Sequence, residues 1–272
     1  MLKTRLITAV ILIPLVVYAV LFLTTDIFSL ILGLIFIAAM WEWGRLVPLQ
    51  DVVVRILYIV VIVGLAGFCW RIGLESIAMP LLLVACAWWL CALVWLVQPQ
   101  FCSENNRACI LMKLLAGVLV SVPAWASLAL LHGSSSSGPK LVLALLIMVW
   151  LADSGAYFAG RYLGKNKLAP MVSPGKTWEG VYGGLLASML FAAVAGWYFS
   201  ASLSWTLTYT LVALVAMMFS VVGDLLESLM KRQSGIKDSG NIIPGHGGIF
   251  DRIDSLVAAA PLFVAGYLWF EL

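Results

Sequence analysis

The chain has 272 residues, of which 63% are hydrophobic and only 11% charged, and its formal net charge is +3. A soluble domain carries about a quarter charged residues because its surface must face water, so this composition excludes a soluble globular protein. The small net charge gives no indication of a nucleic-acid-binding surface. With a mean hydropathy of +1.06, the sequence predicts an integral membrane protein.

Apolar runs long enough to cross about 30 Å of hydrocarbon as helices recur along the whole chain. Because a backbone in lipid must satisfy its own hydrogen bonds, and because the alternation of a membrane barrel is absent, these runs are predicted to be helices. The predicted fold class is an all-α, polytopic integral membrane protein with about nine transmembrane helices. In chain order the predicted spans are 6–23, 28–47, 53–70, 76–97, 110–131, 141–160, 179–199, 205–226 and 253–270.

The first span follows Lys3 and Arg5, as a signal peptide would. It is long, and no small-x-small cleavage site ends it, so we expect it to be retained. The break at 132–139 holds His132 and four serines, and we expect this histidine to be solvated. The five cysteines show no metal-ligand spacing and are expected to be free thiols.

The basic residues indicate the orientation. If the N-terminus is cytoplasmic, the two basic residues on the outside are Arg71 and Lys140, and the other fourteen of sixteen lie inside. This is the bias expected of cytoplasmic loops, and an odd number of spans then places the C-terminus outside. We expect residues 1–140 to form an N-terminal set of about five spans, and residues 141–272 to form the catalytic region.

Two of the predicted cytoplasmic loops, Arg161–Glu179 and Glu227–Arg252, are long, polar and glycine-containing. Long irregular loops in a compact protein are usually functional or disordered. The glycines here are interspersed with specific charged residues, which favours function.

Acidic residues lie at the cytoplasmic ends of three spans, where burial in a membrane is costly and therefore indicates function. Asp153 lies in span six, Asp224 and Glu227 end span eight, and Asp251 and Asp254 open span nine. Residues three apart share a helix face, so each pair can project one way. Such carboxylates suit Mg²⁺, which takes one or two of them together with substrate phosphates. The alternative is a buried ion pair with a nearby arginine or, for Asp251, a charge at a helix N-terminus.

Basic residues suited to phosphates lie beside these acids. Lys176 lies in a turn that leads into span seven, where the start of the helix offers free N–H groups to an anion. Its alternative role is that of a lysine reaching to the membrane interface. Lys231, Arg232 and Lys237 cluster in the next loop, where they could equally be a positive-inside anchor.

His246 has glycines on both sides, in Pro244-Gly245-His246-Gly247-Gly248. Glycines allow the backbone to approach a ligand closely, so we expect His246 to contact substrate. The alternative is a structural histidine.

The polar runs in the last part of the chain resemble the signature of the phosphatidate cytidylyltransferases, the CDP-diacylglycerol synthases of the bacterial membrane. The runs that carry the resemblance are Ser228–Arg232, Lys237–Gly240 and Pro244–Asp254, and upstream of them Asp153–Arg161 and Ser173–Gly180. They are far more specific than a short glycine motif, because fixed charges recur at fixed spacings. The first 140 residues match only in hydropathy and length.

The resemblance implies an enzyme of phospholipid biosynthesis that converts CTP and phosphatidic acid to CDP-diacylglycerol and pyrophosphate. It implies a multi-pass protein of the bacterial inner membrane whose active site faces the cytoplasm, where CTP is found. The lipid phosphate is already an oxyanion near neutral pH, so the reaction needs charge neutralisation and in-line positioning rather than a strong base. The expected partners are the two substrates and membrane lipid, with no nucleic acid, and a homodimer is a further expectation of the resemblance.

Our hypothesis is that Asp224 and Asp251 hold Mg²⁺, with Glu227 and Asp254 as secondary ligands. The resemblance also suggests a second, monovalent cation such as K⁺ nearby. The expected catalytic residues are Asp224, Asp251, Lys176 and His246. The expected substrate-binding residues are Ser173, Lys176, Thr177, Ser228, Lys231, Arg232, Lys237, Asp238, His246 and Arg252.

Two other functions fit parts of this pattern. A CTP-dependent lipid-alcohol kinase would release CDP and phosphorylate a hydroxyl, so the product made from labelled CTP distinguishes it. An ion-coupled transporter would also keep carboxylates in its spans, but near the midplane of broken helices and often with internal repeats. A purely structural scaffold has no reason to concentrate acids and bases at one membrane face.

Overall fold

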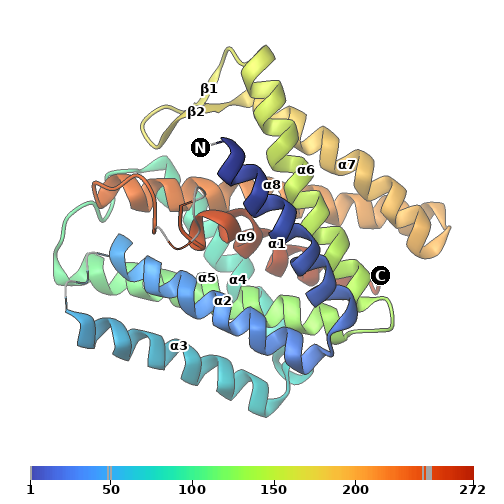
Figure 1. Cartoon of the computed structure of the whole chain (residues 1–272), viewed down its shortest axis with the longest axis horizontal. Coiled ribbons are helices and arrows are strands. Elements are labelled where there is room, and N and C mark those ends of the chain that lie inside the picture. The colour runs from blue at the N-terminus through green and yellow to red at the C-terminus, as the bar shows by residue number, and fades with distance from the viewer. Residues whose placement is uncertain (1, 48, 50, 241, 243–246) are drawn as a thin grey trace.

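The computed structural model describes residues 2–47, 49, 51–240, 242 and 247–272. Over these ranges the chain forms nine α-helices and one two-stranded antiparallel hairpin (Figure 1). The helices are α1 (Leu2–Phe22), α2 (Thr25–Leu46), α3 (Val52–Ile72), α4 (Leu74–Val97), α5 (Arg107–Gly133), α6 (Gly138–Leu163), α7 (Trp178–Ser200), α8 (Leu203–Gln233) and α9 (Phe250–Trp269). The hairpin strands are β1 (Lys167–Ala169) and β2 (Ser173–Thr177). The predicted all-α membrane fold is confirmed, and the hairpin is an addition to it.

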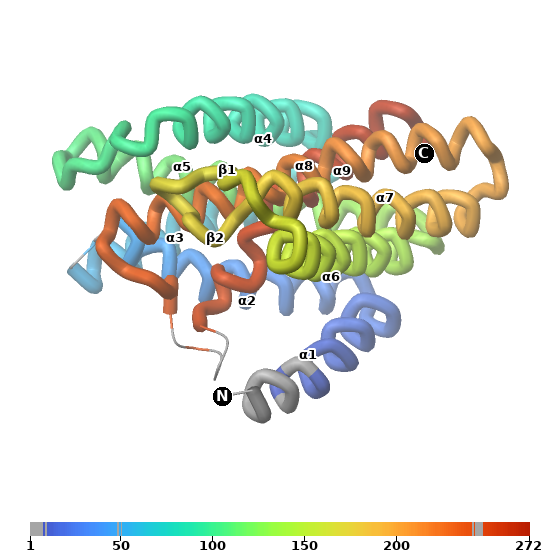
Figure 2. The backbone as a smooth tube through the Cα atoms, turned by 90° about the horizontal axis from the view of Figure 1, so that it is seen from above, coloured from blue at the N-terminus to red at the C-terminus, as the bar shows by residue number. Residues whose placement is uncertain are grey.

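Successive helices run in opposite directions (Figure 1). The connections after α2, α4, α6 and α8 therefore lie toward one end of the bundle, and those after α1, α3, α5 and α7 toward the other. Figure 2 shows α1 and α4 at opposite edges, with α5, α8 and α9 between them. The polar motifs of the sequence fall near the first of these two ends.

Seven helices of the described residues, α2 to α8, are long and apolar enough to cross a membrane. In α1 the apolar stretch is Val10–Phe22, which is shorter than the apolar stretches of these seven helices. The outer helices expose apolar side chains that lipid can cover: α3 buries Tyr58 and Ile62 and leaves most of its other apolar residues exposed. The chain is thus a multi-pass membrane protein, while nine spans and a cytoplasmic N-terminus stay predictions.

The interior is organised around α5, whose second half is almost continuously buried. It packs against α2, α3, α4, α6 and α9. His132, near the end of α5, is 3% exposed, so the expectation that it is solvated was wrong. Its ring nitrogens lie 2.9 Å from the carbonyl oxygen of Val20 and 3.0 Å from the hydroxyl of Thr25, and the ring stacks on Phe28. Partners on α1 and α2 therefore satisfy both nitrogens inside the protein. The five cysteines are free, as expected.

The predicted loop Glu227–Arg252 was placed to begin too early. The helix α8 ends at Gln233, two turns beyond residue 226, where the span was expected to end. Lys231 and Arg232 lie in the last turn of that helix rather than in a loop. An ion pair between Glu227 and Lys231, four residues apart, and the buried side chains of Leu229 and Met230 extend the helical face. Hydropathy misses this extension because the segment is polar although one of its faces is buried.

The other predicted loop is largely a hairpin. In it Lys167 pairs with Thr177 and Ala169 with Ser173. Below the hairpin α6 and α7 pack closely, since a Cβ at Gly155 would lie 2.7 Å from the carbonyl oxygen of Gly183. Small residues at such a crossing let two backbones approach, as is usual between membrane helices. This crossing fixes the second half of α6, which carries Asp153, against the helix that follows the hairpin.

Candidate active site

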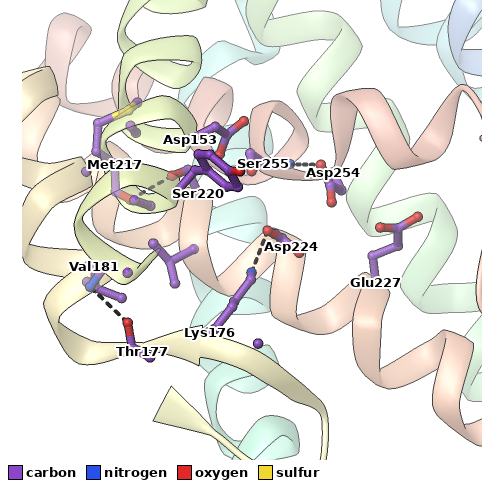
Figure 3. Close-up of a pocket in the computed structure, with 18 of the residues that line it drawn as sticks. Asp153, Lys176, Thr177, Val181, Met217, Ser220, Asp224, Glu227, Asp254 and Ser255 are labelled. Atoms are coloured by element: carbon purple, nitrogen blue, oxygen red, sulfur yellow. Dashed lines mark hydrogen bonds and ion pairs between the residues drawn. The ribbon is translucent and has the colours of Figure 1, made fainter. Parts of the chain in front are cut away.

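A cavity of about 640 Å³ lies among α6, β2, α7, α8 and α9 (Figure 3). Apolar and charged side chains both line it, and the basic residues Arg161, Lys176 and Lys231 come from elements at the end that carries the hairpin. The charged residues that line it are Asp153, Arg161, Lys176, Asp224, Glu227, Lys231, Asp238, Asp251, Arg252 and Asp254. Four helices and a strand thus bring together motifs that lie up to a hundred residues apart in the sequence.

These described residues give the cavity six carboxylates and four basic groups. If all are ionised, negative charge exceeds positive charge by two. A cavity of this balance attracts cations, and it repels a polyanion such as a triphosphate unless a cation enters with it. The charge pattern therefore favours a site where a divalent cation and phosphates bind together.

Lys176 reaches the cavity because the hairpin holds it there. The hydroxyl of Thr177 accepts a hydrogen bond from the N–H of Gly180 at 3.2 Å and so caps the start of α7. The carboxylate of Glu179 accepts hydrogen bonds from the backbone N–H groups of Lys165 and Asn166, which ties β1 to the same helix start. The lysine therefore projects from an anchored strand rather than from a free loop.

The ammonium of Lys176 lies 2.5 Å from Oδ2 of Asp224 on α8, as the dashed line in Figure 3 shows. The two side chains are 25% and 30% exposed, so water reaches this pair. The other carboxylate oxygen of Asp224 lies 3.5 Å from the hydroxyl of Ser228. Asp224 thus combines a charged partner with access to the cavity, as a ligand-binding carboxylate must.

A second lysine holds two carboxylates deeper in the protein. Lys231 lies 2.8 Å from Glu227 and 2.8 Å from Asp251. Glu227 is 1% exposed and Asp251 is 7% exposed. The second oxygen of Glu227 is buried and has no hydrogen-bond partner among the described residues. Such an orphaned oxygen is costly, and it is available to a ligand that enters the cavity.

Asp153, on α6, and Asp254, on α9, both line the upper part of the cavity in Figure 3. Asp254 accepts a hydrogen bond from the N–H of Ser255 at 2.8 Å. From the sequence, Asp153 could be either a functional residue or the partner of a buried ion pair. Among the described residues, no salt bridge to Asp153 is found within 4.0 Å. It belongs with the carboxylates of the cavity.

Most of the predicted site residues converge. The cavity is lined by Lys176, Thr177, Asp224, Glu227, Lys231, Asp238, Asp251, Arg252 and Asp254. The predicted residues that are described but do not line it are Ser173, Ser228, Arg232 and Lys237. The guanidinium of Arg232 donates to the carbonyl of Val172 at 3.2 Å, a contact that ties α8 to the hairpin. His246 lies outside the described residues.

Sequence reasoning missed two contributors. Arg161 lines the cavity, but in the sequence it served only as a marker of orientation. Glu42 is fully buried on α2 and contacts the loop before α9. It satisfies the criterion that selected Asp153, a carboxylate within an apolar span, and that signal could have found it.

The donor set suits Mg²⁺ in kind, because carboxylate oxygens are the ligands that this ion prefers. Among the described residues, however, no three acidic, histidine or cysteine side chains lie close enough together to form a metal-binding group. Lysines hold Asp224, Glu227 and Asp251 instead. The residues present can therefore contribute one or two ligands to a cation, with the remainder coming from phosphates or water.

The similarity of this chain to known proteins extends over nearly its whole length. The sequence model of the Cytidylyltransferase family matches residues 3–270. A phosphatidate cytidylyltransferase of Pseudomonas aeruginosa is 43% identical over 270 residues, which cover 99% of this chain and 97% of that protein. One of Haemophilus influenzae is 38% identical over 292 residues, which cover 99% of each chain. The similarity thus includes the first 140 residues, where the sequence motifs gave no match beyond hydropathy and length.

Proposed function

The chain belongs to the Cytidylyltransferase family, and on this premise we propose that it is a phosphatidate cytidylyltransferase, which converts CTP and phosphatidic acid to CDP-diacylglycerol and pyrophosphate. The observation that carries the proposal is the nearly full-length similarity to relatives of that name. The cavity supports it independently, since it combines charges suited to phosphates with an apolar region inside a membrane protein.

In the proposed reaction an oxygen of the lipid phosphate attacks the α-phosphorus of CTP. A new phosphorus–oxygen bond forms there, the bond from the α-phosphorus to the β-phosphate oxygen breaks, and pyrophosphate leaves with the electron pair. The attacking oxygen is already ionised near neutral pH, so the chain has to orient two polyanions and stabilise the charge that moves to the leaving group.

We assign that stabilisation to the basic groups of the cavity. Lys176, Arg161 and Arg252 line the cavity, and Lys176 is paired with Asp224. Lys176 is held by an ion pair that water reaches, so it can exchange a carboxylate for a phosphate oxygen at little cost. Substrate-binding roles for Ser173, Thr177, Ser228, Lys231, Arg232, Lys237, Asp238 and His246 stay predictions.

We propose that Asp224 and Asp251 hold Mg²⁺ and that Glu227 and Asp254 are its secondary ligands. The excess of carboxylic over basic side chains in the cavity, six against four, and the partnerless oxygen of Glu227 support this assignment. Bound there, the ion would act as a Lewis acid toward the phosphoryl oxygens. A second, monovalent cation such as K⁺ stays an expectation of the family resemblance, as does a homodimer.

The apolar wall of the cavity supports a lipid substrate. It is formed by Ala152, Val181, Leu185, Met217 and Val221. We propose that the glycerol and the first acyl carbons lie there, with the headgroup toward the end that carries the hairpin. That end would face the cytoplasm in the bacterial inner membrane, since the positive-inside bias puts fourteen of sixteen basic residues on the same side.

The test is to incubate the full-length protein, purified in detergent, with CTP labelled at the α-phosphate, Mg²⁺ and, in parallel reactions, either phosphatidic acid or a lipid alcohol. We expect label to enter CDP-diacylglycerol, and Asp251→Asn to prevent it. Label released as CDP with a phosphorylated lipid alcohol would support the kinase instead. No turnover with either lipid would contradict the proposal.

A further inference from the structure

A buried carboxylate from the N-terminal half lies at the base of the loop that precedes α9. Glu42, near the end of α2, is 0% exposed. Its Oε2 accepts hydrogen bonds from the backbone N–H of Phe250 at 2.9 Å and from the hydroxyl of Ser239 at 3.3 Å. Nothing in the sequence motifs links α2 to this loop, because the partners lie 197 and 208 residues further along the chain.

Asp251 binds the same two parts of the loop from the other side. Its Oδ2 accepts hydrogen bonds from the N–H of Ser239 at 3.1 Å and from the N–H of Gly248 at 2.8 Å. Ser239 is therefore held by Glu42 through its hydroxyl and by Asp251 through its backbone. Two carboxylates close the base of the loop, and one of them is a proposed metal ligand.

The contact with Phe250 also determines where α9 begins. The N-cap residue of this helix is Ile249, whose side chain cannot accept a hydrogen bond. The first N–H groups of a helix need acceptors, and negative charge is favourable beside them. Glu42 supplies the acceptor from another helix. Because Asp251 directly follows Phe250, the position of its carboxylate depends on this cap.

Two glycines of the loop are explained by the same side chain. A Cβ built on Gly240 or Gly248 would collide with the carboxylate of Glu42. From the sequence we attributed the glycines around His246 to the close approach of a ligand. At Gly248 the group that approaches is Glu42, together with the hydroxyl of Ser239. The loop is thus shaped to receive a carboxylate from α2.

We propose that Glu42 is a positioning residue for the reaction: it closes the base of the 238–250 loop and caps α9, and so holds Asp251 in place in the cavity. This inference rests on the proposed function for its catalytic consequence. It also gives the N-terminal helices a part in the chemistry, since α2 supplies one of the two carboxylates that order the loop.

The test compares Glu42→Leu, which removes the acceptor, with Glu42→Gln, which keeps an acceptor oxygen, in the full-length protein in detergent. Phe36→Ala is the matched control, since Phe36 is buried on the same helix, 3% exposed, and has no hydrogen bond to the loop. Hydrogen–deuterium exchange over 238–250 measures how strongly the backbone N–H groups of the loop are protected, and it needs neither substrate nor metal. Steady-state formation of CDP-diacylglycerol then measures the consequence.

We expect Glu42→Leu to speed exchange over 238–250 and to lower kcat by about 30-fold or more, in line with the loss of two hydrogen bonds to a buried carboxyl group. Glu42→Gln should keep the slow exchange and a kcat within about fivefold of wild type. Phe36→Ala should lower the melting temperature without a local change in loop exchange. Where Glu42→Leu does not fold, Ser239→Ala serves instead, with a kcat about three- to tenfold below wild type.

Wild-type exchange over the loop in Glu42→Leu or Ser239→Ala would overturn the inference, and so would equal loosening by Phe36→Ala. An unchanged kcat in an active enzyme would also overturn it. If the wild type makes no CDP-diacylglycerol while Glu42→Leu still loosens the loop, the proposed function fails and the loop assignment stands.

Discussion

The cavity contains two lysine–carboxylate clusters of opposite character. The pair Lys176–Asp224 joins a hairpin to α8, and its side chains are 25% and 30% exposed. The cluster of Lys231 with Glu227 and Asp251 joins α8 to α9, and its side chains are 14%, 1% and 7% exposed. Both have short contacts, so the difference between them is access to water.

That difference predicts different roles. An ion pair that water reaches contributes about 0–1 kcal/mol and can open for a ligand. A buried cluster that loses one partner leaves a charge without compensation, which costs about 3–5 kcal/mol. We therefore regard Lys176–Asp224 as the pair that exchanges partners during the reaction, and Lys231 as the fixed support that holds the two proposed metal ligands Glu227 and Asp251 in place. We therefore expect changes to the exposed pair to lower activity with little loss of stability, and changes to the buried cluster to lower stability.

The largest effect is expected for Asp224→Asn. It keeps the shape of the side chain but removes the charge, and turnover should fall by about a thousandfold or more, because a proposed metal ligand is lost. The melting temperature in detergent should stay near that of wild type, since the exposed pair contributes little to folding. Full activity in this variant would remove the metal assignment.

Lys231→Met should instead lower the stability of the protein directly. Methionine fills a similar volume, but Glu227 and Asp251 are then left buried without their shared cation. We expect a loss of about 3–5 kcal/mol of stability, seen as a much lower melting temperature, with activity lost as a result. The double replacement Lys231→Met with Glu227→Gln is the control, and it should recover part of the stability. A melting temperature unchanged by Lys231→Met would contradict the role of a fixed support.

Lys176→Gln tests the exchangeable pair from its other side. The fold should be unaffected, and kcat/KM for CTP should fall by about ten- to a hundredfold, since one cation no longer offsets the phosphate charge. Lys165→Gln is a matched control, because Lys165 is a lysine beside the same hairpin that does not line the cavity. A similar loss in both variants would indicate a general effect of surface charge, not a contact of Lys176 with substrate.

The sequence predicts the fold well, since hydropathy determines where helices must form in a membrane. It also selects Asp224 and Asp251, because a carboxylate in an apolar span is costly and therefore conspicuous. It does not predict that Lys176 pairs with Asp224 or Lys231 with Asp251, since each of these pairs joins two different elements of the chain. The hairpin was missed because a short strand with Pro174 and Gly175 has weak β-propensity. The end of α8 was missed because the buried face of a polar segment becomes visible only after packing.

The smallest effect concerns how the hairpin holds the exchangeable pair. Thr177 caps α7 through its hydroxyl, and Thr177→Val keeps the shape of the side chain while removing the acceptor. We expect a loss of about 1 kcal/mol in stability and a few-fold rise in KM for CTP, with kcat nearly unchanged, because the neighbouring Lys176 becomes less well placed. Thr177→Ser should behave as wild type, since serine caps equally well. If valine leaves KM unchanged although the helix start is weakened, Lys176 does not depend on the cap. The hairpin would then serve only to connect α6 to α7, and the exchangeable pair would be positioned from α8 alone.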